Sequence, residues 1–340
     1  MSNRMGRVLG VAAAAAIGFA GLGTARAESL EFRIATLAPP GSGWMKGLEK
    51  GAQALEQETS GRVKIKYYGG AVQGDERDAI RKMKLGGLDG VVVTGVGLAM
   101  IDKSIRILEM PRMFDSIEEM DYVREKMWPY FQKRFEAKGY VLGAPADVGW
   151  VYFMSRDPVK SMADLQKTKA WMWTDDKVVR TMFEKLKVSG VPLGVPDVLP
   201  SLQSGRIDAC YGPPLAAMAF QWNTKIKYMT SMPMSYSVGS TVLRKDVYEK
   251  MAAGDQAIEK AITDKLGVAL RKNIRRDNND AQLAMTRKGV KVITTPAAMI
   301  AAFDKAAEEA WSDLVDRIYT QKQLDLVLKY RAQYREKHGK

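Results

Sequence analysis

Cysteine and histidine are almost absent from this chain of 340 residues, with one of each, Cys210 and His338. A single cysteine excludes an intramolecular disulfide. Zinc sites built on cysteine or histidine lack their ligands. Catalytic arrangements that need a core histidine are equally disfavoured, because His338 lies in the polar C-terminal tail. We therefore expect no metal, no cofactor and no enzymatic activity.

Motifs for phosphate or nucleic-acid binding are also missing. The glycines at 86–87 and 95–97 lack the spacing of a phosphate-binding loop or a dinucleotide fingerprint. The net charge is +13, but the basic residues are spread among acidic ones and form no zinc-finger, RNA-binding or basic-helix motif. A protein with a basic surface and no nucleic-acid partner is the expected class.

Long apolar runs are confined to the N-terminus. Arg4 and Arg7 precede an apolar stretch over residues 8–22, and Ala25 and Ala27 supply small residues at a spacing that a signal peptidase accepts. The alternative, a membrane anchor, needs about twenty apolar residues. The sequence therefore predicts a signal peptide over residues 1–27, cleavage after Ala27 and a periplasmic protein.

Strand and helix patterns alternate through the rest of the chain. Strand-like stretches at 30–37, 63–67 and 91–93 are separated by helix-like ones, the second of them over 75–85. This order is typical of a parallel sheet with covering helices, so the predicted fold class is α/β.

The pattern restarts after residue 150, with a strand-like stretch at 169–173, a helix-like one at 177–186 and a later strand-like one at 240–244. This predicts two lobes joined by crossing hinge strands. We expect lobe I to contain residues 28–149 and 239–275, and lobe II to contain 150–238 and 276–340 with the C-terminal helices. Two α/β lobes linked in this way form a cleft that closes on a small solute by hinge motion.

Four sequence segments, in this order and spacing, carry a resemblance to a known family. They are residues 61–65 (GRVKI), 74–77 (GDER), 83–90 (MKLGGLDG) and 195–208 (VPDVLPSLQSGRID). The chain resembles the periplasmic solute-binding proteins of tripartite ATP-independent periplasmic (TRAP) transporters over nearly all of its length after residue 28. The resemblance implies a binding protein, expected to be a monomer, that delivers a small organic solute to the membrane subunits of a TRAP transporter driven by an ion gradient.

The chain departs from this family at the residues that hold the ligand. The relatives generally bind an organic acid through an arginine, whose guanidinium matches the geometry of a carboxylate. Aligned on Leu165 and Lys169, the position of that arginine is Trp171. A second arginine of the family would lie near Trp150, and a polar residue of many relatives aligns with Pro213.

This alignment predicts a cleft lined by aromatic residues. Strand alternation places Lys169, Trp171 and Trp173 on one face, and indole rings suit planar solutes or cations. A core position remains the alternative for each tryptophan, and a carboxylate held by Lys169 or Arg244 remains open. The predicted ligand-binding residues are Trp171, Trp173, Trp150, Trp44, Tyr211, Pro213, Asp147 and Lys169. Asp147 is expected to add a negative group for an amine or hydroxyl of the ligand, and Trp222 is interpreted as structural.

Two other functions stay open at this point. The same fold can serve a different membrane complex or a sensor with a non-carboxylate ligand. An exported enzyme or adaptor on this scaffold is the third possibility.

Overall fold

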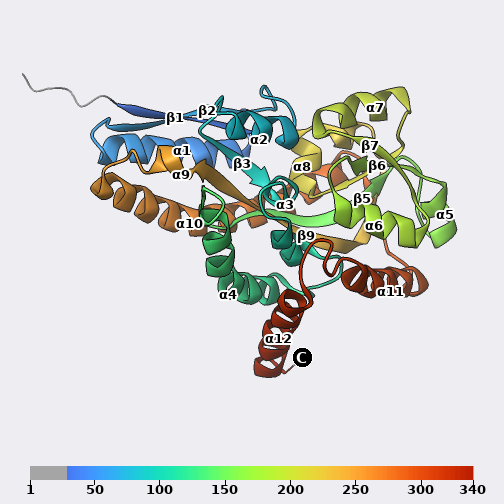
Figure 1. Ribbon diagram of the computed structural model, residues 1–340. Coiled ribbons are helices and arrows are strands. Elements are labelled where there is room, and N and C mark those ends of the chain that lie inside the picture. The colour runs from blue at the N-terminus through green and yellow to red at the C-terminus, as the bar shows by residue number, and fades with distance from the viewer. Residues whose placement is uncertain (1–28, 340) are drawn as a thin grey trace, which may run out of the picture.

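One mixed sheet passes through both lobes of the molecule (Figure 1). The structure, a computed structural model, describes residues 29–339, so the predicted signal peptide and its cleavage point lie outside the described residues. The strands described there are β1 (Leu30–Thr36), β2 (Val63–Tyr68), β3 (Gly90–Thr94), β4 (Tyr140–Leu142), β5 (Ala146–Ser155), β6 (Lys169–Trp173), β7 (Ser189–Leu193), β8 (Ala209–Gly212), β9 (Tyr228–Arg244) and β10 (Lys291–Ile293).

Helices cover both faces of this sheet, as a sheet with parallel crossovers requires. The α-helices are α1 (Gly43–Glu58), α2 (Glu76–Lys84), α3 (Gly95–Ala99), α4 (Ile117–Glu136), α5 (Met162–Lys167), α6 (Lys177–Leu186), α7 (Val198–Ser204), α8 (Pro214–Ala219), α9 (Lys245–Tyr248), α10 (Ala253–Arg287), α11 (Ala297–Asp313) and α12 (Gln321–Lys337). Three 3-10 helices are η1 (Lys103–Glu109), η2 (Val195–Asp197) and η3 (Trp222–Thr224). The α/β, two-lobed fold predicted from the sequence is confirmed.

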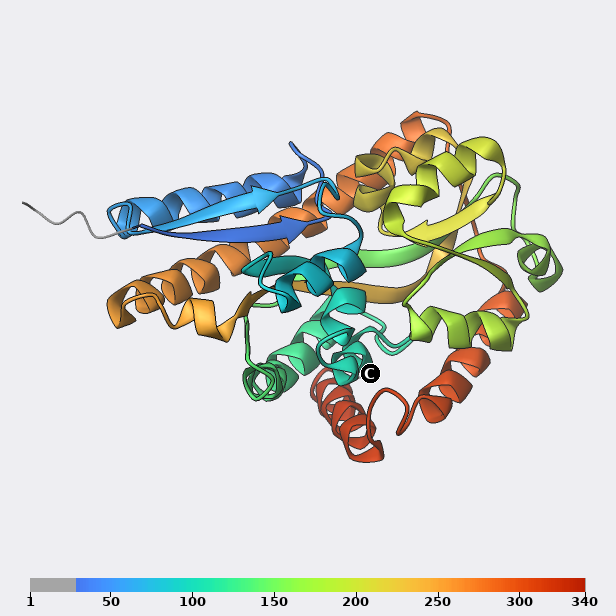
Figure 2. The same ribbon diagram turned by 45° about the horizontal axis from the view of Figure 1, so that its top comes forward.

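Two long antiparallel strands, β5 and β9, join the lobes (Figure 2). The N-terminal part of β9 pairs with β5 and β10, and its C-terminal part pairs with β3 and β4. The strand order is β2-β1-β3-β9-β5-β8-β6-β7, so β1 to β3 lie in one lobe and β6 to β8 in the other. The cleft between the lobes is therefore bordered by the crossing strands.

Alternation along β1 assigns its side chains to two faces of the lobe I sheet. Phe32 and Ile34 point to the face that carries α1, and they pack with Leu55 of that helix. Ala35 points to the opposite face, where the buried residues of α2, η1 and α4 form a much larger apolar cluster. The two faces are thus covered by different layers of helices.

Helix α10 runs across both lobes and holds the crossover. In its second half, Asn278 donates to the carbonyl of Val148 at 2.9 Å and accepts from the backbone N–H of Leu215 at 3.1 Å. Gly149 lies beside it with φ of +132°, and a Cβ there would be 2.7 Å from the Asn278 side chain. A glycine is required at 149 on both counts.

The C-terminal helix differs from the predicted lobe assignment. Helix α12 packs on α4 of lobe I (Figure 1). Tyr334 and Tyr122 have ring centroids 5.6 Å apart there, and Arg335 pairs with Asp115 at 2.7 Å. The pattern had assigned residues 276–340 to lobe II, but an amphipathic helix packs wherever an apolar surface is within reach. The other predicted lobe boundaries stay a prediction. Among residues 29–339, no helix has both the length and the apolar character of a membrane span.

Candidate ligand-binding cleft

A cavity of about 630 Å³ opens between the lobes and continues along the lobe I sheet. Its part between the lobes, called here the interlobe cleft, has aromatic, hydroxyl and acidic side chains in its lining, together with Pro213 and aliphatic residues. The lining includes Thr36, Trp44, Glu76, Thr94, Glu109, Trp171, Trp173, Asp176, Tyr211, Pro213, Phe220 and Trp222. The volume lies in the range that holds a small organic ligand.

Stacked aromatic rings form the lobe II wall of the interlobe cleft. Trp171 lies nearly parallel to Tyr211, with ring centroids 4.7 Å apart and an interplanar angle of 17°. Trp222 meets Trp171 edge-on at 5.3 Å. The Trp171 indole N–H donates to the carbonyl of Leu193 at 3.0 Å, so its polar edge is already satisfied by the protein. Trp171 is 2% exposed, so it packs in the lobe II core behind the cleft surface and offers no free donor.

Hydrogen bonds cross from one lobe to the other at the edge of this wall. The Asp75 carboxylate, at the start of α2, accepts from the Trp173 indole N–H at 2.8 Å and from the Val195 N–H at 3.4 Å. Arg77 and Asp175 form an exposed ion pair at 3.3 Å nearby. These contacts join lobe I to lobe II, so the structure represents a state in which the lobes touch.

A buried charge cluster lies beside the cleft. Arg106 of η1 pairs with Glu109 and, at 2.7 Å, with Asp176 at the start of α6. The Glu109 carboxylate also accepts from the Val238 N–H at 2.6 Å and the Ser237 hydroxyl at 3.0 Å. Burial, the largest effect, raises the pKa of Glu109. Two carboxylates thus share one guanidinium, which leaves no positive charge for a ligand.

Glu76 is a second buried acidic group at the cleft. Its side chain is 2% exposed. It accepts from the Thr94 N–H at 2.7 Å and from the Thr94 hydroxyl at 3.0 Å. Burial raises the pKa of Glu76 to about 8. Glu76 is therefore mostly protonated at neutral pH.

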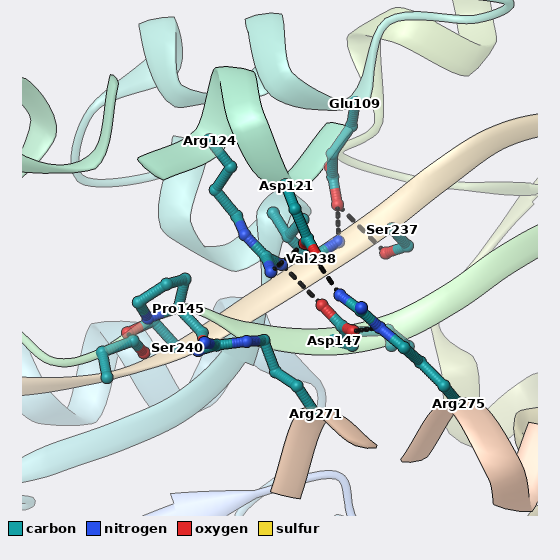
Figure 3. A network of polar contacts seen from close by, with 12 residues as sticks. Glu109, Asp121, Arg124, Pro145, Asp147, Ser237, Val238, Ser240, Arg271 and Arg275 are labelled. Carbon is teal, nitrogen blue, oxygen red and sulfur yellow. Dashed lines mark hydrogen bonds and ion pairs between the residues drawn. The ribbon is translucent and has the colours of Figure 1, made fainter. Parts of the chain in front are cut away.

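Asp147 is held by arginines, as Figure 3 shows. Its carboxylate pairs with Arg124 at 2.5 Å and with Arg275 at 2.6 Å, and its side chain is fully buried. Asp121 joins the same network through Arg275 at 2.7 Å. The negative charge of Asp147 is thus neutralised at the crossover and is not available to an amine or hydroxyl of a ligand.

Comparison with known proteins identifies the family. Residues 34–318 match the model of the bacterial extracellular solute-binding proteins, family 7. This chain belongs to that family.

Relatives of this solute-binding protein are distant in sequence. It is 27% identical over 187 residues to a solute-binding protein of Chromohalobacter salexigens, a match that covers 54% of this chain and 55% of the relative. The chain spans about half the length of the first curated relatives that it matches.

Solved structures share its fold. A TRAP periplasmic solute-binding protein of Xanthobacter autotrophicus with bound β-D-galacturonate has a TM-score of 0.83 at 21% identity, covering 88% of this chain and 99% of that one. One of Desulfovibrio salexigens with bound orotic acid has a TM-score of 0.84 at 20% identity, covering 90% and 99%. The fold of this solute-binding protein is that of TRAP periplasmic solute-binding proteins.

Six of the eight residues predicted for the site line the cavity of this solute-binding protein. They are Trp171, Trp173, Trp44, Tyr211, Pro213 and Asp147. Their role in binding stays a prediction.

Trp150 and Lys169 are located elsewhere. Trp150 packs edge-on against Tyr236, at 5.0 Å between ring centroids. It contacts the large apolar cluster formed with α2, η1 and α4. Lys169 is the first residue of β6 and its side chain is exposed, at the opposite end of the strand from Trp173. Neither residue belongs to the cavity lining.

The acidic residues of the cleft and the Trp222 ring were not predicted from the sequence. Glu76 stands in the 74–77 segment that carried the resemblance, and Asp176 precedes a helix as its N-cap, so both had a visible local signal. Glu109 had none, because its position depends on η1 folding under β9. Trp222 was interpreted as structural, yet it lines the cleft as well as packing in the core.

Proposed function

We propose that this solute-binding protein is the periplasmic receptor of a TRAP transporter, which captures a small organic solute as a monomer and passes it to the membrane subunits. The family membership supports the binding role, and the structural likeness to TRAP proteins supports the choice of transporter. A receptor of this kind needs two lobes that close on its cargo, and the β5–β9 crossover supplies the connection.

We further propose that the solute carries a planar ring or another apolar group and has no carboxylate as its main recognition element. The observation that supports this proposal is the stacking of Trp171 on Tyr211 in the wall. The resemblance to the family aligns Trp171 with an arginine, and this alignment is part of the proposal. No lysine or arginine belongs to the described lining of the interlobe cleft. The lysines that line the cavity farther on, Lys245 and Lys260, are paired with Glu136 and Asp264.

The two solved relatives contain galacturonate and orotic acid, both carboxylates. In this cleft, a carboxylate would lose its water and meet Glu109 and Asp176 without gaining a free cation. An unpaired buried carboxylate costs several kcal/mol. An uncharged or cationic ring compound avoids that cost, because the indole faces accept both. The electrostatics of the cleft therefore favour an uncharged or cationic solute over a carboxylate.

The mechanism that we propose is closure of the lobes around the solute. Lobe I contributes Trp44, Thr36 and Thr94, and lobe II contributes the aromatic wall. Contacts such as that of Asp75 with Trp173 form only when the lobes meet. A solute that touches both lobes shifts the population toward this closed state, by as much as its affinity differs between the two states. The closed surface is what the membrane subunits recognise.

Tryptophan variants test the cleft. Trp171→Ala and Trp44→Ala should each weaken the binding of ring compounds, by about tenfold or more. Trp44 is a partly exposed ring of the lining, and Trp171 supports the Tyr211 and Trp222 rings of the wall. Trp150→Ala is the matched control, an aromatic residue of the same region outside the lining, and should leave the affinity unchanged. Binding is measured by titration calorimetry, and circular dichroism checks the fold. Equal effects of all three variants would refute the assignment of the cleft.

Uptake measurements test the transporter assignment. Cells that express the chain together with its TRAP membrane subunits should accumulate the bound solute only while the ion gradient is intact. Uptake that continues after collapse of the gradient, with ATP present, would contradict a TRAP transporter.

A further inference from the structure

The cavity does not end at the interlobe cleft. It continues along the lobe I sheet, on the face that carries α1 and α10. The sheet contributes Ile34, Ile65 and Val92, and the helices contribute Leu48, Leu266 and Leu270. We call this part, defined by these six residues, the sheet chamber. Figure 2 shows α1 and α10 running alongside the strands of lobe I.

The sheet chamber is apolar but incompletely filled. Ile65, Val92, Leu48, Leu266 and Leu270 each remain partly accessible, although they lie between a sheet and its covering helices. Side chains in such a layer are normally close-packed, with few voids larger than a water molecule. Apolar surface left in contact with water costs roughly 25 cal/mol per Å². A ligand that covers this surface therefore gains free energy.

The sheet chamber communicates with the interlobe cleft through the C-terminal ends of two strands. Thr36 ends β1 and Thr94 ends β3, and both line the same cavity as Trp171 and Trp44. Farther along each strand, the next side chain on that face is apolar, Ile34 on β1 and Val92 on β3. A molecule anchored in the cleft can therefore extend along the sheet without crossing a polar barrier.

The carboxylate at the far end of the sheet chamber is hydrogen-bonded within the protein. Glu259 accepts from the Thr263 hydroxyl at 2.8 Å and from the Tyr248 hydroxyl at 3.2 Å. These groups satisfy one another, so the part of a ligand that reaches them gains nothing from a polar terminus. The chamber thus selects an apolar extension.

We propose that the sheet chamber is a binding site for an apolar chain of the solute, so that the cargo is an amphiphile. Its ring or cationic end lies in the interlobe cleft, and its alkyl chain lies between the lobe I sheet and helices α1 and α10. This inference rests on the proposed function, because it assigns a site to the apolar half of the solute whose other half binds at the aromatic wall.

A chain-length series tests the proposal. Phenylalkylamines and phenylalkanols, from one to six methylenes, are titrated against the protein by calorimetry. The affinity should rise about fourfold for each added methylene, since burying one methylene contributes about 0.8 kcal/mol. An affinity independent of chain length would overturn the sheet chamber, while the binding of the shortest members would leave the proposed function intact.

Filled-chamber variants make the test specific. Leu266→Trp fills the sheet chamber, and Val268→Trp, two residues along α10 with a side chain 60% exposed, is the matched control. Leu266→Trp should abolish the gain with chain length and keep the affinity of the shortest member, whereas Val268→Trp should behave as the wild type. Ile65→Trp repeats the filling from the sheet side if Leu266→Trp fails to fold. A gain that persists in the filled variants would overturn the proposal.

An uncharged fluorescent probe separates the two hypotheses. N-phenyl-1-naphthylamine should brighten on binding to the wild type and to Val268→Trp, and should not brighten with Leu266→Trp. If the probe behaves in this way while no phenylalkylamine or phenylalkanol binds, the sheet chamber stands and the proposed solute class fails. Absence of probe binding to the wild type would overturn the sheet chamber.

Discussion

The two faces of the lobe I sheet are packed very differently. The face toward α2, η1 and α4 has a large core in which side chains such as Ile80, Ile107 and Phe131 are almost completely buried. The face toward α1 and α10 has a small core around Phe32 and Leu55, surrounded by partly accessible apolar residues. Both faces belong to the same strands, so strand propensity does not explain the difference.

The difference indicates that one face of the sheet stabilises lobe I and that the other borders the ligand cavity. The dense face supplies the transfer free energy that holds lobe I together. The open face keeps apolar surface available, and the start of α10 is held there by the pair of Asp255 with Arg62 at 2.7 Å. Space that would be a packing defect elsewhere is continuous with the ligand cleft here.

The charge cluster at the edge of the dense face gives the largest expected effect. Arg106→Met leaves Glu109 and Asp176 without their cation and should lower the free energy of unfolding by about 3–5 kcal/mol at neutral pH. Arg77→Met, which breaks the exposed pair with Asp175, should cost about 0–1 kcal/mol. Urea unfolding measures both. Similar losses for the two variants would show that the buried cluster is not structurally important.

A matched pair of isoleucines compares the faces directly. Ile80→Ala on the dense face should cost about 2–5 kcal/mol, because it leaves a cavity in a closed core. Ile65→Ala on the open face should cost about 1 kcal/mol or less, because its surroundings are already open to solvent and less burial is lost. Chemical denaturation provides the two values. An Ile65→Ala loss as large as that of Ile80→Ala would mean that the sheet chamber is packed in solution.

Glu76, at the junction of the cleft and the sheet, gives an effect that depends on pH. Its pKa is raised to about 8 in the folded protein, from an ordinary value of 4.5, so the folded state binds the proton more tightly. This group's stabilisation is complete below pH 4.5 and is lost as the pH rises through 8. The melting temperature of the wild type should therefore fall between pH 5 and 9 by more than that of Glu76→Gln.

The control for Glu76 is Glu49→Gln, which changes an exposed glutamate of α1. It should retain the pH dependence of the wild type. If Glu76→Gln also retains it, Glu76 is ionised in the folded protein and the cleft is more negative than proposed.

Much of the fold followed from local pattern. The helix over 177–186 and the strand over 169–173 were predicted with the bounds that the structure has, because each is bounded by clear signals such as the Asp176 cap. Only 240–244 of β9 was predicted as a strand, although it spans Tyr228–Arg244. Its first half contains Pro233 and many methionines, and it is a strand because β5 and β10 pair with it.

The candidate site was less accessible from sequence. Trp171 and Tyr211 were found through their alignment with the family and through strand alternation. Asp147 was expected to offer a free negative charge, but Arg124 and Arg275 come from helices distant in sequence and neutralise it. The sheet chamber had no local signal in the sequence. A strand has the same apolar pattern whether the helices over it are closely packed or leave a cavity.

The central claim is that the cleft holds a ring-containing solute without relying on a carboxylate. The most direct test is a calorimetric titration with ring compounds that share one skeleton and differ only in bearing a hydroxyl, an ammonium or a carboxylate group. We predict that the alcohol and the amine bind, and that the carboxylate binds at least tenfold more weakly. Tighter binding of the carboxylate than of both the alcohol and the amine would contradict the account.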